Sequence, residues 1–183
     1  MSIENDRWIG EQYLQHGTIE PVSESQIGAN VISNGLSSCG CDHGVSDKLK
    51  IIANANSAII DRKAFEERLF VSGQGEADIL SPNSFALARS IEYFRNPRDV
   101  LAICVGKSTY ARCEIIVNVT PFEPEWEGIS PLRYQTPLPN RPGSVPTKGC
   151  ARYCFSVQKS RARSARLTAR VNTETTGIVL PRL

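Results

Sequence analysis

Residues 100–119 read VLAICVGKSTYARCEIIVNV. Residues 100–105 and 115–119 are runs of apolar and β-branched residues, which are typical of strands. Between them lies the loop GKSTYAR, residues 106–112, which combines a glycine, two cations and short hydroxyl donors. The stretch therefore predicts two strands joined by a polar loop, and a loop of this composition suits a polyphosphate.

Similar short apolar runs recur along the chain, separated by Gly, Pro, Asn and Asp. They lie at residues 31–33, 50–53, 58–60, 69–71, 77–80, 84–88 and 91–94. Regularly spaced short strands favour a mostly β barrel or sandwich over a βαβ fold. One short helix is predicted over residues 3–16, with Gly17 as its stop. Beyond residue 128 the pattern predicts no strand before residues 177–180.

The composition is that of a globular protein. The 183 residues are 40% hydrophobic and 22% charged, and this length favours one domain, residues 1–183, with its own core. No apolar run reaches the roughly 18 residues of a membrane span, and the first residues lack the basic and apolar regions of a secretion signal. We therefore expect a cytoplasmic protein with no membrane partner.

Charge is distributed unevenly, although 21 basic and 19 acidic residues give a formal net charge of only +2. Residues 129–174 hold nine basic residues and one acidic residue, a formal charge of +8, and the rest of the chain is therefore −6. This basic segment could bind nucleic acid by neutralising phosphates, or it could be a solvated and poorly folded stretch. It has few aromatic residues for base stacking, which favours the second interpretation.

The cysteines could in principle form a zinc site. Cys39, Cys41, Cys150 and Cys154, with His43, supply enough soft ligands. Their spacing does not match the paired Cys-x-x-Cys pattern of zinc knuckles. Without a secretion signal, reduced thiols are expected.

The loop itself allows two interpretations. Gly-Lys-Ser at 106–108 is not a Walker P-loop, because no glycine stands five residues before Gly106 and no clear helix is predicted after it. Taken alone, the tripeptide fits a polar turn as well as a phosphate-binding loop.

Together with the residues around it, the loop sequence is a far more specific signal than the tripeptide alone. GKSTYARC, residues 106–113, and IIVNVTPFEPEWEG, residues 115–128, closely resemble the signature of bacterial dCTP deaminases. Further blocks agree: VISNGLSS at 31–38, SPNSFALA at 81–88, EYFR at 92–95 and TGIVLPR at 176–182. The resemblance covers residues 1–128 and resumes over 175–183.

The resemblance implies a dUTPase-like (β-clip) all-β fold, a distorted barrel, and a homotrimer with active sites between subunits. It implies hydrolysis of dCTP to dUTP and ammonia without zinc, with Mg²⁺ bound through the triphosphate. The substrate-binding loop of the family corresponds by position to Lys107, Ser108, Thr109, Tyr110, Ala111 and Arg112. Lys107 and Arg112 are expected to offset phosphate charge or polarise the reaction centre, and Ser108 to orient the water or the pyrimidine.

The catalytic residue of the family is missing. Its general base is a Glu five residues after Gly128, where this chain has Arg133. Arginine does not give up its proton at neutral pH, so the chain offers no catalytic residue at this position. Three alternatives follow: a dCTP deaminase active as written, a catalytically inactive nucleotide-binding member of the fold, or a bifunctional dCTP deaminase and dUTPase.

A change of reading frame explains the departure. Codons permitted for residues 129–138, read one base earlier, can encode Asp-Ile-Thr-Leu-Glu-Ile-Ser-Asn-Thr-Thr, which restores the family's strand and its Glu. Codons permitted for residues 147–156 and 167–173 give two further family-like blocks with the same offset. We interpret residues 129–174 as frame-shifted relative to the family, with one base lost near Gly128. Resequencing the gene tests this, since an undisturbed frame with different codons contradicts it.

Other departures from the family are not frame effects. Cys39 and Cys41 replace Tyr, His43 and Gly44 replace a Val-Arg pair, and Glu114 replaces a Gly. The loss of the Arg is expected to weaken phosphate or interface contacts. The Glu114 carboxylate is expected to lie close to a bound triphosphate.

The altered segment is also expected to fold poorly. Pro131, Pro137 and Pro139 fall where the family has core strands, and proline cannot donate to a strand ladder. We therefore predict that residues 129–174 are poorly packed with exposed cations.

Overall fold

The computed structural model describes residues 2–24, 32–52, 70–74, 79–136, 143–144 and 149–158. Its helices are α1 (Asp6–His16) and α2 (Ser108–Arg112). Its strands are β1 (Ser2–Ile3), β2 (Ile19–Glu20), β3 (Gly35–Ser37), β4 (Gly40–His43), β5 (Lys48–Ile52), β6 (Phe70–Gln74), β7 (Ile79–Leu80), β8 (Ser84–Arg95), β9 (Val100–Gly106), β10 (Ile116–Asn118), β11 (Glu127–Thr136), β12 (Gly143–Ser144) and β13 (Ala151–Val157). Strands dominate the described residues, which confirms the mostly β prediction.

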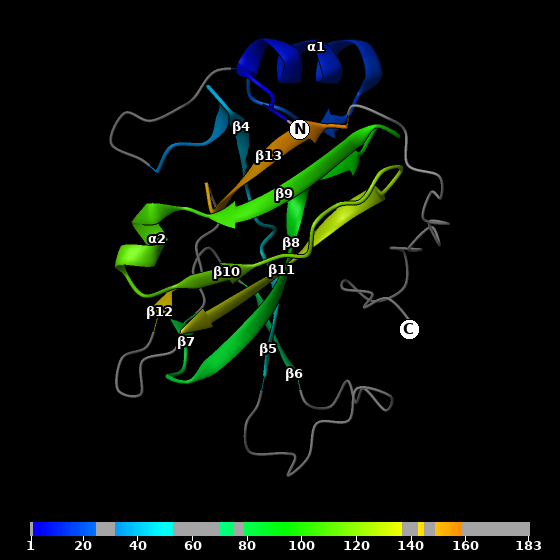
Figure 1. Ribbon diagram of the computed structural model, residues 1–183. Helices are drawn as coiled ribbons and strands as arrows, with labels where there is room; N and C mark the ends of the chain where they lie inside the picture. The colour runs from blue at the N-terminus through cyan, green and yellow to red at the C-terminus, as the bar shows by residue number, and fades with distance from the viewer. Residues whose placement is uncertain are drawn as a thin grey trace.

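Two antiparallel sheets carry the fold, with α1 at one end of the molecule (Figure 1). In one sheet the order is β1-β13-β4-β3, and β9 also pairs with β13. In the other the order is β10-β11-β8-β5-β6, and β2 also pairs with β8. A short pair, β12 with β7, lies apart from both sheets.

Helix α1 begins and ends at capping residues. The Asn5 side chain accepts a hydrogen bond from the Trp8 N–H at 3.0 Å, and Gly17 ends the helix in the left-handed region at φ 59°. The predicted helix over residues 3–16 is therefore confirmed except at its start, because Ser2–Ile3 pairs with β13 instead. Among the described residues, no helix is long and apolar enough to cross a membrane.

The longest strand, β8, joins two runs that the sequence pattern separated. Alternate side chains from Ser84 to Phe94 are buried, and Ser90 keeps the alternation because its hydroxyl donates to the Glu92 carbonyl at 2.7 Å. The strand lies between β11 and β5 and positions both. The predicted strand at 31–33 is absent at Ile32 and Ser33, and those at 58–60 and 177–180 lie outside the described residues.

Residues 129–136 contradict the prediction of a poorly packed segment. They belong to β11, which is hydrogen-bonded to β10 on one side and β8 on the other. Leu132 and Tyr134 are 1% and 0% exposed, because the apolar residues fall on the core face with period two. Pro131 and Arg133 point to the exposed face, and Pro131 lies at a register shift. A proline is tolerated at such an irregularity, since the ladder is interrupted there.

Residues 151–157 also correct that prediction. They form β13, which pairs with β4, β9 and β1, and which buries Tyr153 and Phe155. The prediction that no strand occurs between residue 128 and residue 177 is therefore wrong for β11, β12 and β13. Pro137, Pro139 and the basic run at 159–170 lie outside the described residues.

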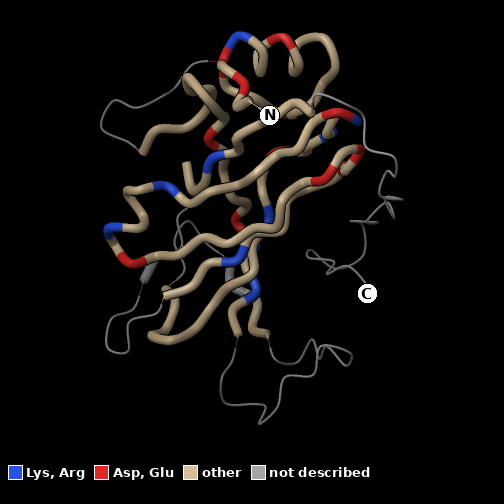
Figure 2. The backbone as a smooth tube through the Cα atoms, in the orientation of Figure 1, with Lys and Arg blue, Asp and Glu red and all other residues tan. Residues whose placement is uncertain are grey.

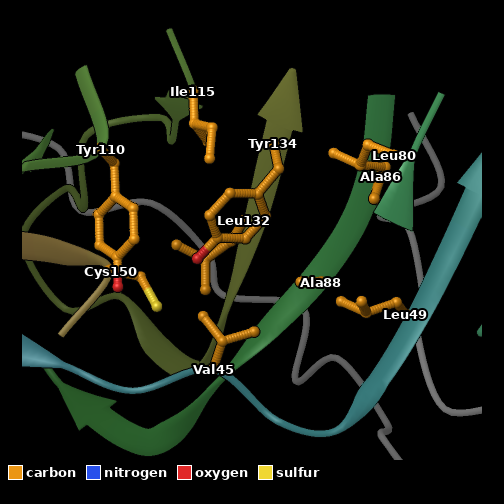
Figure 3. Packing of buried hydrophobic residues seen from close by; sticks show 10 residues of the cluster. All are labelled: Val45, Leu49, Leu80, Ala86, Ala88, Tyr110, Ile115, Leu132, Tyr134 and Cys150. Carbon is orange, nitrogen blue, oxygen red and sulfur yellow. The ribbon is translucent and has the colours of Figure 1, made fainter. Parts of the chain in front are cut away.

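The core consists of two clusters of buried side chains. One (Figure 3) contains Val45, Leu49, Leu80, Ala86, Ala88, Tyr110, Ile115, Leu132, Tyr134 and Cys150. The other contains Ile9, Ile19, Cys41, Phe94, Val100, Ala102, Phe122, Tyr153 and Phe155. The first cluster includes Tyr110 from α2, so the loop after β9 is anchored in the core.

Leu132→Ala is expected to lower the free energy of unfolding by about 3 kcal/mol, because it leaves a cavity beside Tyr134. Urea unfolding measures the change. Arg133→Gln is the matched control on the exposed face of the same strand, with an expected change of about 0.5 kcal/mol or less. Equal effects of the two substitutions would mean that β11 is not a central strand.

Candidate active site

The buried side chain of Tyr110 anchors the loop that follows β9. Lys107 leads from β9 into α2 with extended backbone angles, φ −82° and ψ 145°. Tyr110 is 6% exposed, and its ring points into the core beside Cys150 (Figure 3). This anchor fixes the backbone of α2 against the core.

The other side chains of α2 face solvent. Ser108, Thr109, Ala111 and Arg112 are all exposed. The turn that follows contains Glu114, also exposed and at φ 58°. In Figure 2, basic and acidic segments of the chain lie together around α2. The loop therefore presents two hydroxyls, a guanidinium and a carboxylate on one exposed turn.

Lys107 differs from its neighbours because its ammonium group points inward. Its Nζ donates to the Ser33 carbonyl, to Ser33 Oγ at 2.6 Å and to Asp42 Oδ2 at 2.8 Å. The side chains of Lys107 and Asp42 are 10% and 0% exposed. The sequence-predicted loop is thus tied to the loop before β3 and to β4.

Asp42 also binds a second cation. Arg152 of β13 donates through Nε to Oδ1 at 2.7 Å. Burial by itself would raise the pKa of Asp42, but the hydrogen bonds and charges of Arg152 and Lys107 outweigh burial and lower it. Asp42 is therefore an ionised carboxylate between two cations.

Arg133 lies on a neighbouring element. On β11 it pairs with Asn118 of β10, the strand into which the loop continues. Its guanidinium lies 4.7 Å from the centre of the Phe85 ring and donates to Gln135 Oε1 at 3.3 Å. The described contacts of Arg133 do not include the loop residues 107–112.

Comparison with known proteins decides the family. Residues 3–134 match the family model described as dCTP deaminase-like. The chain belongs to the dCTP deaminase-like family. It is 66% identical over 141 residues to a dCTP deaminase of Acidobacterium capsulatum, covering 76% of each chain. It is 52% identical over 161 residues to a dCTP deaminase of Cupriavidus necator, covering 85% of each.

A solved structure shows the same fold. The 2'-deoxycytidine 5'-triphosphate deaminase from Agrobacterium tumefaciens superposes with a TM-score of 0.63 at 13% sequence identity. The match covers 85% of this chain and 47% of the other. The predicted family and its dUTPase-like fold are both confirmed.

A buried polar cluster lies at the position where this chain departs from the dCTP deaminase pattern. Glu92 Oε1 accepts a hydrogen bond from the Gly44 N–H at 2.9 Å, whereas Oε2 is buried and accepts none. His43 is close to this oxygen, with its Nδ1 3.9 Å from Oε2. Nδ1 is also 3.1 Å from the Gly44 carbonyl, and Nε2 is 3.7 Å from Cys104 Sγ.

Burial controls both titratable groups of this cluster. It raises the pKa of Glu92 to about 7, although backbone hydrogen bonds led by the Gly44 N–H oppose the shift. It lowers the pKa of His43 to about 4, against the opposing effects of the Gly44 carbonyl and Asp42. At neutral pH the imidazole is uncharged.

The candidate zinc ligands are dispersed. Cys41 and Cys150 are buried, Cys39 is exposed and Cys154 is half-buried, all as free thiols. Burial raises the pKa of both Cys41 and Cys150 to about 12. In the described part of the chain, no three His, Cys, Asp or Glu side chains are grouped so that they could hold a metal ion.

Sequence reasoning missed Asp42, Ser33 and Arg152 as partners of the loop. Asp42 stands 65 residues before Lys107, and Arg152 stands 110 residues after Asp42. The sequence held one signal of these contacts. Asp42 is a charged residue within the cysteine-rich run at 39–43, and the other residues of that run are expected to be buried.

Proposed function

We propose that this chain binds dCTP at the loop containing Lys107, Ser108, Thr109, Tyr110, Ala111 and Arg112, the site for hydrolytic deamination of dCTP to dUTP and ammonia. The supporting observation is the loop itself, which Tyr110 anchors in the core while the side chains of Ser108, Thr109 and Arg112 face solvent. The relatives at up to 66% identity are dCTP deaminases.

The exposed groups suit a triphosphate. The Arg112 guanidinium can pair with phosphate oxygens, and the Ser108 and Thr109 hydroxyls can donate to phosphate or pyrimidine oxygens. Mg²⁺ enters as part of the substrate, bound to the triphosphate. Its charge offsets that of the phosphates.

The reaction needs a proton acceptor at the attacking water. A general base removes one proton from water as the oxygen bonds to C4 and passes it to the amine, which leaves as ammonia when the C4–N bond breaks. The second water proton ends on N3 of the uracil ring. Arg133 cannot accept this proton, because the guanidinium stays charged. We therefore propose that the chain retains dCTP binding and is impaired in the deamination step.

Incubation with dCTP and Mg²⁺ tests this assignment. The expected result is dCTP binding without detectable product. Formation of dUTP and ammonia would contradict the role given to Arg133, and dUMP with pyrophosphate would identify the bifunctional alternative. Failure to bind dCTP would refute the site.

Two loop substitutions are expected to act in opposite directions. Arg112→Gln should weaken dCTP binding about tenfold or more, since it removes a charged phosphate partner. Glu114→Gln should tighten dCTP binding, because it removes a carboxylate from the same exposed turn. Isothermal titration calorimetry measures both dissociation constants. A shift in the same direction for both would show that the loop does not contact the triphosphate.

We also propose, from the length and composition, a single cytoplasmic domain over residues 1–183 that binds neither nucleic acid nor membrane. From the family resemblance we propose that it assembles as a homotrimer. Light scattering should give the mass of three 20.1 kDa chains. A monomer would refute the assembly. Salt-sensitive retention of RNA would refute the exclusion of nucleic acid.

A further inference from the structure

We infer that Arg152 is a positioning residue of the dCTP site: it neutralises Asp42, and so leaves the charge of Lys107 available to the triphosphate. This inference rests on the proposed function and deepens it. It adds a residue of β13, outside the loop at 106–112, to the groups that set nucleotide affinity.

The first argument is the balance of charge around Asp42. Its carboxylate is ionised and meets two cations, the Lys107 ammonium at 2.8 Å and the Arg152 guanidinium at 2.7 Å. One anion and two cations leave an excess of positive charge in this group of side chains. Without Arg152 the pair of Lys107 with Asp42 would be neutral, and a neutral pair attracts an anion less than a cation does. Arg152 therefore supplies the excess charge.

The second argument is how the Asp42 carboxylate is shared. Arg152 donates to both of its oxygens, from Nε to Oδ1 at 2.7 Å and from Nη2 to Oδ2 at 3.1 Å. Lys107 donates to Oδ2 at 2.8 Å. A two-point contact between a guanidinium and a carboxylate is among the strong ion pairs of proteins. Asp42 therefore keeps a well-matched partner when the Lys107 ammonium turns toward a phosphate oxygen.

The third argument is burial. The Asp42 side chain has no exposed surface, and a buried carboxylate that loses its cation is strongly destabilised. Without Arg152, Lys107 would have to stay with Asp42 when a nucleotide arrives. The Lys107 side chain is 10% exposed, so its release toward a ligand depends on how firmly Asp42 holds it. Arg152 lowers the cost of that release.

Strand pairing places Arg152 where it can do this. In β13 it lies opposite Asp42 of β4 and opposite Val105 of β9. Lys107 follows Val105 by two residues, where β9 ends and α2 begins. Strand β13 therefore connects the buried carboxylate with the start of the loop.

Substitution of Arg152 is the first test, with dissociation constants measured by calorimetry in the presence of Mg²⁺. Arg152→Gln should weaken dCTP binding about tenfold, whereas Arg152→Lys, which keeps a cation, should lose less. In Arg152→Gln, dCMP should lose less affinity than dCTP, because it carries fewer phosphate charges. Unchanged dCTP binding, or equal losses for dCTP and dCMP, would overturn the inference.

Arg95→Gln is the matched control for this series. It also removes an arginine that pairs with a carboxylate, here Glu20 at 2.6 Å, but this pair is exposed and lies away from the described contacts of the loop. The variant should bind dCTP like the unaltered protein. An equal loss in Arg95→Gln and Arg152→Gln would show that the effect is not specific to Asp42, and would overturn the inference.

Removal of the Asp42 charge is the second test. The double variant Asp42→Asn/Arg152→Gln should bind dCTP within about twofold of Asp42→Asn, because no carboxylate is left to hold Lys107. It should thus regain the affinity that Arg152→Gln loses. If Arg152 itself contacts a phosphate, adding Arg152→Gln to Asp42→Asn weakens binding about tenfold, and the inference fails. This comparison decides the question even where Arg152→Gln alone does not fold.

Lysine acylation separates this inference from the proposed function, because it needs no nucleotide. With a limiting reagent and peptide mass spectrometry, Lys107 should react about threefold or more slowly in Arg152→Gln than in the unaltered protein, since Asp42 then holds it alone. The exposed Lys48 should react equally in both. Equal Lys107 rates would overturn the inference. Slower Lys107 acylation, in a protein that does not bind dCTP, would refute the proposed function alone.

Discussion

Arg133→Glu should give this chain measurable dCTP deamination, where the unaltered chain gives none. The substitution places a carboxylate at the position of the family's general base, and a positioned base contributes about 100-fold to 10,000-fold to a hydrolytic rate. The side chain at 133 is exposed on β11, so placing a carboxylate there is not expected to cost desolvation energy. Release of ammonia and dUTP from dCTP measures the gain.

The control Arg133→Gln separates the effect of the new carboxylate from the effect of losing the arginine. It also removes the contact with Phe85, yet it supplies no base, and it should remain inactive. Equal activity in the two variants would show that a carboxylate at 133 is not the missing group. Turnover by the unaltered chain would show that another residue acts as the base.

Glu92→Gln should change how stability depends on pH. The pKa of Glu92 is about 7 in the folded protein against 4.5 ordinarily, so folding favours its protonated form. Its contribution to stability is full below pH 4.5 and is lost as pH rises to about 7. The pKa of His43 is about 4 against 6.5, so its contribution is full above pH 6.5 and is lost as pH falls to about 4.

These two contributions oppose each other between pH 4.5 and 6.5, and in the unaltered protein they largely cancel. In Glu92→Gln the effect of His43 remains, and stability should rise with pH over this interval. Relative to the unaltered protein, the variant should gain up to about 3 kcal/mol between pH 4 and pH 8. The thiols of Cys41 and Cys150 beside Glu92 stay uncharged here, since the pKa of each is about 12.

Urea unfolding at a series of pH values measures both slopes. His43→Phe should show the reverse behaviour, with stability falling from pH 4.5 to 7, because only the effect of Glu92 is left. The exposed Glu127→Gln is the control for loss of a carboxylate at the surface. A pH-independent difference between Glu92→Gln and the unaltered protein would mean that folding does not raise the pKa of Glu92.

The sequence predicted those parts of the fold whose signals are local. The caps of α1 and the strands flanking residues 106–112 are set by neighbouring residues, and both are found where the pattern indicates. The family pattern at 106–128 also located the loop. These signals do not depend on what lies across the sheet.

Long-range pairing could not be predicted. Asp42 meets Lys107 and Arg152 only because β4, β9 and β13 are brought together in one sheet. Strand β11 was missed because Pro131 was expected to interrupt a strand ladder, whereas its ring lies on the exposed face of the strand. The period-two pattern of residues 128–136 predicts that strand only when Pro131 is placed on the outer face.

The anchoring of the loop at Tyr110 has a consequence for how a nucleotide associates. A turn that is ordered before its ligand arrives loses little conformational entropy on binding, so more of the contact energy remains as affinity. Association should then follow a single bimolecular phase, with a rate that rises linearly with nucleotide concentration and no slow closing step. We therefore expect the loop to act as a preformed binding surface and not as a closing lid.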